Sequence, residues 1–483
     1  MGSQIDMLKK LPEVLENAQT LWEKAIPADL ACEALFDDYE GVRCANRENS
    51  LIISENLAAA KSLLAAIRAG TSAPFRLIYM DPPFFTRTKY TANCRILTNA
   101  GEALDLPQHA FHDIWRESGD TEEKGLPGYL IVLMARVIAA RDLLAEDGCL
   151  WLHLDHHAVH YAKTLTDAVF GGGDHLINEV VWQYKSGGST KKRFSRKHDT
   201  LLFYAKDHRR YYFMPMEEKS YNRGRKAYRF KGVKEYRDDG GWYTLVNMKD
   251  VWSIDMVGRT SFERTGYATQ KPEELLGRII ESCSKEGDLC GDLYGGSGTL
   301  AAAAQRRGRR WVAIDENPLA AMHSERRLAA MGAPFSLLAG GEALDGKEGD
   351  GKVRFEGGWK LLGTMYSGKK LLSLTVTAYH PDEAFMPKLP AERKKFLTAC
   401  ETCPGGMVFG LAVDPVYDGS TFRPKGLAYG KGNVEVLAGA DDISAGESSF
   451  ALRVTDVFGR CYYCLSPYRN ESEGVWTAIA ASI

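Results

Sequence analysis

The stretch DLYGGSGTL at residues 292–300 decides the fold, because it lies between an expected strand at 288–293 and an expected helix at 299–307. Gly296 and Gly298 allow the backbone of this turn to approach a ligand closely. The pattern is typical of an α/β sheet that binds a ligand at its edge. A turn that serves only the fold would carry the same glycines, so the turn alone leaves both interpretations open.

The acidic end of the next strand points to a nucleoside. That strand is expected at 311–314 and ends at Asp315, whose carboxylate is placed to accept hydrogen bonds from two ribose hydroxyls. A dinucleotide site asks for GxGxxG, and the position three residues after Gly298 is Ala301, which some such sites accept. The chain has no GxxxxGK[ST] loop, which disfavours nucleotide hydrolysis.

The same alternation of strands and helices occurs twice more before this turn. Apolar runs and Ala/Leu-rich segments predict a strand at 51–53, a helix at 57–69, a strand at 75–80, a helix at 128–144 and a strand at 149–154. Strands that alternate with helices indicate a parallel sheet. The α/β domain is therefore predicted to be split along the chain.

Composition indicates a soluble globular protein of several domains. The chain has 483 residues, of which 45% are hydrophobic and 26% charged, and no apolar run is long enough to cross a bilayer. The first residues lack the apolar core of a secretory signal, and ten cysteines are too few for a disulfide scaffold. We expect a cytoplasmic protein with no membrane partner.

Five segments are expected from the shifts in composition. They are a helical segment at 1–48, α/β parts at 49–185 and 267–340, a basic insertion at 186–266, and a β-rich domain at 350–483. The insertion holds 19 Lys and Arg against 10 Asp and Glu, although the whole chain has a net charge of −2. A glycine-rich and charged linker precedes the β-rich domain.

The tetrad DPPF at 81–84 follows directly on the strand expected at 75–80, at the edge where open α/β sheets bind their ligands. Asp81 and the carbonyl of Pro82 are acceptors for the two N–H bonds of an exocyclic amine, and the prolines remove competing N–H donors. Phe84 offers a face on which an extruded base stacks. The alternative is a plain turn followed by core aromatic residues.

Three motifs together resemble the beta class of DNA amino-methyltransferases, which includes the modification subunits of type III restriction systems. DPPF at 81–84 matches that family's Asp-Pro-Pro-Tyr/Phe motif and precedes DLYGGSGT at 292–299, which resembles Asp-Pro-Phe-Xaa-Gly-Ser-Gly-Thr. TQKP at 269–272 matches a family segment just before the glycine motif. Leu293 and Tyr294 depart from the family's Pro and Phe, which puts cofactor affinity in doubt.

The resemblance covers about residues 50–335 and implies a Rossmann-like fold with circularly permuted motif order and S-adenosylmethionine as cofactor. The implied catalytic residues are Asp81, Pro82, Pro83 and Phe84. The implied cofactor residues are Glu55, Asn56, Gln270, Lys271, Pro272, Asp292, Tyr294, Gly296, Gly298, Thr299, Asp315 and Asn317. In this family the methyl donor needs only in-line placement beside the amine.

The implied substrate is double-stranded DNA, methylated at N6 of an extruded adenine, because Asp at position 81 favours adenine over cytosine in this family. Cytosine N4, RNA, and a non-catalytic DNA-binding subunit of a restriction or defence complex are the alternatives. The resemblance also implies a homodimer and a restriction or defence partner.

The basic insertion is predicted to hold DNA, since cations neutralise phosphates and aromatic side chains meet unstacked bases. The candidates are Lys191, Lys192, Arg193, Arg196, Arg223, Arg225 and Lys226. A solvated surface that contacts nothing is the alternative.

Two further groups resemble metal ligands. Cys400 with Cys403, and Cys461 with Cys464, form two CxxC pairs, but their separation exceeds the usual zinc spacing and CYYC is predicted to be a strand. Buried thiols are therefore favoured over zinc. Histidines 153, 156, 157 and 160 follow the strand expected at 149–154, where capping and packing are favoured over a metal. No metal is predicted.

Overall fold

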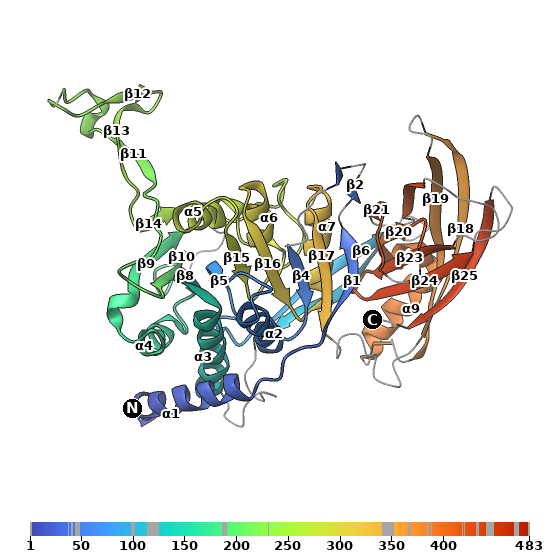
Figure 1. Ribbon diagram of the computed structural model, residues 1–483, viewed down its shortest axis with the longest axis horizontal. Coiled ribbons are helices and arrows are strands. Elements are labelled where there is room, and N and C mark those ends of the chain that lie inside the picture. The colour runs from blue at the N-terminus through green and yellow to red at the C-terminus, as the bar shows by residue number, and fades with distance from the viewer. Residues whose placement is uncertain are drawn as a thin grey trace.

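A large mixed sheet forms the centre of the computed structural model (Figure 1). The structure describes residues 2–36, 38–39, 42–43, 49–97, 102–113, 125–185, 191–229, 231–340, 352–365, 369–383, 386–387, 389–417, 419, 421–430, 434–440, 449–467 and 473–481. The linker predicted before the β-rich domain lies outside these residues, except at its two ends. No helix in the described part of the chain is both long enough and apolar enough to cross a membrane.

The sheet has ten strands in the order β1-β17-β4-β16-β15-β5-β8-β10-β9-β14. Its centre is six parallel strands: β17 (Phe335–Gly340), β4 (Ser50–Ile53), β16 (Arg310–Asp315), β15 (Leu289–Asp292), β5 (Phe75–Met80) and β8 (Leu144–Leu154). Antiparallel β10 (His198–Ala205) and β9 (Leu176–Gln183) and the short β14 (Val251–Ser253) extend one side. The predicted α/β fold is confirmed.

Helices cover both faces of this sheet because its central strands are apolar on both sides. In β5, Ile78 and Met80 face one layer, whereas Leu77 and Tyr79 face the other. The first layer contains α1 (Gly2–Lys24), α2 (Asn56–Arg68), α3 (Gly125–Leu143) and α4 (Val159–Phe170). The second contains α5 (Glu273–Cys283), α6 (Thr299–Arg306) and α7 (Pro318–Ala329).

The N-terminal segment differs from the expected helix over 1–48. The helix α1 ends at Lys24, and β1 (Leu30–Phe36) pairs antiparallel with β17 at the edge of the sheet. A short pair, β2 (Asp38–Tyr39) and β3 (Val42–Arg43), follows. Strand pairing here overrides the local preference of an Ala/Leu-containing segment for helix.

The basic insertion also differs from the predicted single block at 186–266. Its strand β10 belongs to the central sheet, next to β8. Only a three-stranded sheet, β11 (Glu217–Tyr221), β13 (Gly241–Asn247) and β12 (Tyr236–Asp238), stands away from the body as an arm, with the short helix η2 (Arg223–Arg225) (Figure 1). Another short helix, η1 (Gly173–His175), precedes β9.

Two four-stranded antiparallel sheets follow the α/β domain, at the end of the molecule opposite the arm (Figure 1). One contains β22 (Glu435–Ala440), β19 (Lys370–Pro381), β18 (Lys352–Thr364) and β25 (Glu473–Ala481). The other contains β21 (Gly426–Tyr429), β20 (Val408–Asp414), β23 (Ser449–Asp456) and β24 (Cys461–Pro467). The helices α9 (Pro390–Thr402) and η4 (Pro404–Met407) and the hairpin β6 (Lys89–Leu97) with β7 (Ala103–His112) pack with them.

This β-rich part is fastened to the α/β domain through α7. The buried carboxylate of Glu325 pairs with the guanidinium of Arg453 in β23 and accepts a hydrogen bond from the Tyr429 hydroxyl. A second contact joins Gly459 to the backbone of Pro318 at the start of α7. The two approach so closely that a Cβ at position 459 would lie 2.6 Å from that backbone. The β-rich part therefore supports the helix that begins beside the glycine turn.

Candidate active site

A cavity of about 580 Å³ opens at the carboxyl ends of the central parallel strands. Because β5 and β15 are parallel neighbours, with Leu77 opposite Cys290, the loops that follow them meet at one edge. Asp81 and the glycine turn line this cavity together, although they are separated by more than 200 residues.

Fourteen of the sixteen predicted catalytic and cofactor residues line the cavity: Glu55, Asn56, Asp81, Pro82, Pro83, Phe84, Gln270, Lys271, Asp292, Tyr294, Gly296, Thr299, Asp315 and Asn317. Gly298 and Pro272 do not. Gly298 has a φ of +69° at the start of α6, where a Cβ would lie 2.8 Å from the Ser324 hydroxyl. Pro272 precedes the first residue of α5. Both shape the backbone rather than the cavity wall.

One oxygen of the Asp81 carboxylate forms an ion pair, and the other has no hydrogen-bond partner among the described residues. Its Oδ2 pairs with the ammonium of Lys271. Its Oδ1 is buried, lies 3.7 Å from Nδ1 of His153, and accepts no hydrogen bond from any residue in the described ranges. The ring of Phe84 lies 5.2 Å from the Lys271 ammonium. A buried, unpaired acceptor beside an aromatic ring is costly unless a ligand supplies the donor.

The loop after Asp81 is fixed by a buried aspartate. Asp113 accepts hydrogen bonds from the backbone N–H groups of Phe85 at 3.1 Å and Thr86 at 2.5 Å, and from the Thr86 hydroxyl at 2.7 Å. Phe85 has a φ of +64°, which is unfavourable for a bulky residue. The Tyr129 hydroxyl donates to the carbonyl of Pro83 at 2.8 Å. The tetrad is therefore held in one conformation by groups outside the motif.

Asp315, which also lines the cavity, has a structural role that was not predicted. Its Oδ2 accepts the backbone N–H of Gly296 at 2.8 Å and its Oδ1 accepts that of Asn317 at 2.9 Å. The carboxylate thus holds the glycine turn, where Gly296 has a φ of +50°. Its neighbour Glu316, which was not predicted, is exposed and also lines the cavity.

A buried arginine organises the predicted pair at the start of α2. The guanidinium of Arg136 in α3 donates to the side-chain oxygens of Glu55 and Asn56, both at 2.5 Å. Asn56 in turn donates to the carbonyl of Leu293 at 3.2 Å. No motif marks Arg136, which lies in a nearly uniformly apolar helix and was not predicted.

The TQKP segment serves mainly to brace its own loop. Gln270 accepts from the backbone N–H and the hydroxyl of Thr265 at 2.8 and 2.9 Å, and Lys271 reaches Asp81. The Thr299 hydroxyl donates to the carbonyl of Lys271 at 3.3 Å, which ties this segment to the glycine turn.

Sequence reasoning missed an aromatic wall of the cavity. Tyr90 and Phe111 come from the hairpin β6–β7, and their rings stack with centroids 4.5 Å apart. Trp182 and Tyr267 come from β9 and from the loop before α5. These residues belong to no motif, so only their pairing in space identifies them. The wall offers flat apolar surface to a planar ligand.

The predicted DNA residues lie on two separate exposed surfaces outside the cavity. Lys191, Lys192, Arg193 and Arg196 belong to the segment between β9 and β10, together with Phe194, which is 98% exposed. Arg223, Arg225 and Lys226 lie on the arm. The structure therefore does not bring the seven residues into one cluster.

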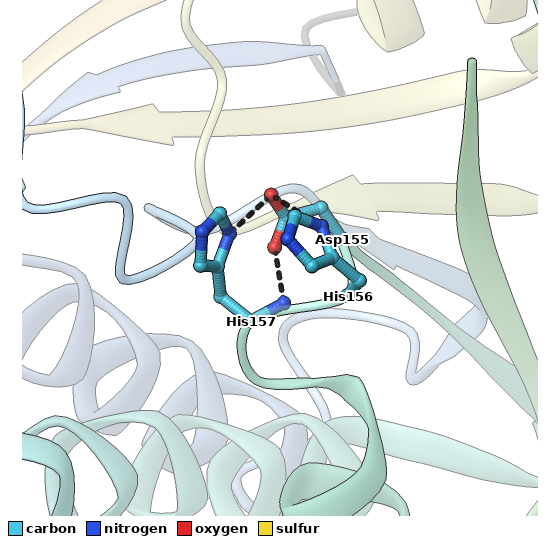
Figure 2. A group of neighbouring side chains, drawn as sticks. All are labelled: Asp155, His156 and His157. Atoms are coloured by element: carbon cyan, nitrogen blue, oxygen red, sulfur yellow. Dashed lines mark hydrogen bonds and ion pairs between the residues drawn. The ribbon is translucent and has the colours of Figure 1, made fainter. Parts of the chain in front are cut away.

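The two candidate groups of metal ligands differ: the ligand atoms of Asp155, His156 and His157 lie within 4.8 Å of one another, close enough to hold a metal ion. No cluster of ligand atoms within the described residues includes the four tail cysteines. Figure 2 shows Asp155 between the rings of His156 and His157. The backbone N–H of His157 donates to Oδ1 of Asp155 at 2.8 Å, and Nδ1 of His157 lies 2.7 Å from its Oδ2. These hydrogen bonds form the turn before α4. The predicted capping is not seen, because the N-cap residue of α4 is Ala158 and no side chain caps this helix.

Comparison with known proteins identifies the family. The profile of the N6/N4 DNA methylases matches residues 75–325, just over half of the chain, and this range contains both DPPF and the glycine turn. The chain belongs to the DNA methylase family. This DNA methylase has the predicted Rossmann-like fold, and membership confirms the predicted methyltransferase class with S-adenosylmethionine as methyl donor.

Relatives of this DNA methylase include the type II methyltransferase M.EcaI of Enterobacter cloacae, 26% identical over 59% of this chain and 71% of the relative. The type II methyltransferase M2.DpnII of Streptococcus pneumoniae is 25% identical over 53% of this chain and 82% of the relative. The solved M1.HpyAVI–SAM complex is 10% identical, with a TM-score of 0.35, over 58% of this chain and 98% of that one. The two relatives are type II methyltransferases by name, whereas the motifs resemble a class that includes type III subunits.

Proposed function

We propose that this DNA methylase transfers the methyl group of S-adenosylmethionine to N6 of an adenine extruded from double-stranded DNA. The observation that carries the proposal concerns Asp81, which lines the cavity and whose buried Oδ1 has no hydrogen-bond donor among the described residues. An exocyclic amine brings the missing N–H group, and its ring stacks on Phe84. Acceptors placed on the two N–H bonds favour the pyramidal, nucleophilic form of the amine.

The chemistry of the donor set fits the cofactor. Asp292 and Glu316 supply acidic groups for an ammonium and for ribose hydroxyls, while Gly295 and Gly296 leave room for a close backbone approach. When bound, S-adenosylmethionine supplies an electrophilic methyl group on a cationic sulfur. The residues of the chain position the amine in line with that methyl group, which is catalysis by orientation.

Identification of the methylated nucleoside tests the choice of adenine. Plasmid DNA incubated with the enzyme and S-adenosylmethionine is digested to nucleosides and analysed by mass spectrometry. We expect N6-methyldeoxyadenosine as the product. Detection of N4-methyldeoxycytidine instead would show that cytosine is the target. If the substrate is RNA, the plasmid would stay unmodified. A homodimer and a restriction partner remain predictions.

Binding of the cofactor is expected to release a proton from Asp292. This carboxyl group is fully buried, and burial raises its pKa to about 8, so at pH 7 it holds a proton in the free protein. The cationic cofactor favours the charged carboxylate and lowers this pKa. Affinity therefore increases as the pH rises from 6 to about 8 and then levels off.

Calorimetric titrations at pH 7 in two buffers with different ionisation heats measure the number of protons released. We expect a release of close to one proton for the wild type and none for Asp292→Asn. Equal heats in the two buffers with the wild-type protein would show that Asp292 does not meet a cationic group of the cofactor.

A further inference from the structure

A row of polar side chains leads from Asp81 across the edge of the sheet. Four neighbouring strands contribute to it in the order β5, β8, β10 and β9. Nδ1 of His153 in β8 lies 3.7 Å from Oδ1 of Asp81, and its Nε2 lies 3.3 Å from Oδ2 of Asp199 in β10. The Tyr184 hydroxyl after β9 donates to Oδ1 of Asp199 at 3.1 Å. Because Tyr184 is only half-buried, the row connects the cavity with the surface.

The hydrogen bonds of His153 define which nitrogen is basic. The imidazole is fully buried, and the Tyr79 hydroxyl lies 2.7 Å from its Nδ1. Burial raises the pKa of Tyr79 well above its usual value, so this hydroxyl keeps its proton and donates it to Nδ1. Nε2 lies 3.3 Å from Oδ2 of Asp199, and because a carboxylate only accepts hydrogen bonds, the ring proton is assigned to Nε2. Nδ1, on the side of Asp81, is therefore the unprotonated nitrogen, and its lone pair accepts the hydrogen bond from Tyr79.

We propose that His153 and Asp199 carry away the proton that the base amine loses on methylation, with Asp81 as the first acceptor. This inference rests on the proposed methylation of an amine and holds for adenine N6 and cytosine N4 alike. His153 acts through Asp81 and does not touch the base. For the transfer, the Asp81 carboxylate must close its distance of 3.7 Å to Nδ1, and the Tyr79 hydroxyl must turn away from that nitrogen.

The step is balanced in atoms and charge. The amine nitrogen bonds to the methyl carbon as the carbon–sulfur bond breaks, and the electron pair of that bond stays on sulfur. The nitrogen, now cationic, loses one N–H proton to Oδ1 of Asp81, which passes it to Nδ1 of His153. The Nε2 proton of His153 moves to Asp199 and then to water, which leaves the ring proton on Nδ1. The starting tautomer returns after product release, when Nε2 takes a proton from water through Asp199 and Nδ1 gives its proton through Asp81 to water in the cavity, so one proton is released per methyl transfer.

Several charged and titratable groups surround His153. The ion pair of Lys271 with Asp81 leaves Oδ1 as the oxygen that faces His153. Aromatic rings lie against the imidazole, with Phe84 and Trp182 both at centroid distances of 5.5 Å. The groups that face the row are Tyr79 and Asp81 from the β5 side, Asp199 from β10, Tyr184 from β9, Lys271 before α5, Asp292 from β15 and Asp155 after β8.

Single-turnover methylation measured in H2O and in D2O tests the proposal. With the wild type, we expect a lower rate in D2O because protons move along the row. In His153→Gln we expect a rate about 10- to 100-fold lower, loss of this solvent isotope effect, and unchanged affinities for DNA and S-adenosylmethionine. The control His160→Gln changes an exposed histidine of α4 and is expected to behave as the wild type.

Asp199→Asn keeps the size of the side chain and removes the final acceptor, so it decides the question if His153→Gln does not fold. A lower rate with an altered solvent isotope effect, in a variant that still binds S-adenosylmethionine, supports the relay. Wild-type rate and isotope effect in a folded variant of either residue would overturn it. No methylated nucleoside from the wild type would instead overturn the proposed function, and this inference with it.

Discussion

Replacing Asp81 by alanine is expected to lower the rate of methyl transfer by on the order of 10³, since the group that accepts the amine N–H is lost. This variant loses the buried Oδ1 that has no hydrogen-bond partner among the described residues, and it loses the pairing of Oδ2 with Lys271. Affinity for S-adenosylmethionine should change little, because the cofactor residues at the glycine turn keep their own hydrogen bonds. Single-turnover transfer of a labelled methyl group to DNA measures the effect.

Asp81→Asn is the matched control, because it removes the charge that pairs with Lys271 without removing the side chain. It keeps the shape and one acceptor oxygen but removes the charge, so its rate should lie between those of the wild type and Asp81→Ala. An alanine variant that methylates DNA at the wild-type rate would remove Asp81 from the mechanism.

Reversing the charges of Lys191, Lys192 and Arg193 to glutamate is expected to weaken DNA binding by about 10- to 100-fold near 0.1 M salt. These side chains are exposed on the segment that joins β9 to β10, which follows the carboxyl end of β9. The slope of log affinity against log salt should fall by about three, one for each phosphate that the protein no longer neutralises. Fluorescence anisotropy across a salt series measures both quantities.

A second triple reversal, at Lys9, Lys394 and Lys395, serves as the control because it changes the net charge equally. These exposed lysines lie on α1 and α9, away from the basic segment. Equal weakening by the two triple variants would mean that overall charge, rather than DNA binding at residues 191–193, governs the affinity.

The central elements were predictable because each is a local pattern. The strand expected at 75–80 is β5 and the helix expected at 299–307 is α6 to within one residue, since apolar runs and glycine turns act over short distances. The edge strand β1 was not predicted, because its pairing with β17 joins residues about 300 apart. Strand preference there comes from tertiary pairing rather than from the segment itself.

In the candidate site, too, residues in local motifs were predicted and residues brought together by tertiary pairing were not. Asp81 and Gly296 belong to motifs with a fixed order along the chain and were found directly. His153 and Asp199 meet only because β8 and β10 pair antiparallel, with His153 opposite Leu201. Tyr90 and Phe111 reach the cavity on a hairpin whose packing depends on the β-rich tail. Strand register and packing bring such residues together, and neither can be read from a single sequence.

The most direct test is a crystal structure of the enzyme with S-adenosylhomocysteine and a DNA duplex that contains its methylation site. We predict an extruded adenine in the cavity, with its amino nitrogen about 3 Å from Oδ1 of Asp81, its ring against Phe84, and the sulfur on the side of Gly296. A target base that lies elsewhere, or a sulfur on the far side of the sheet from Asp81, would contradict the account.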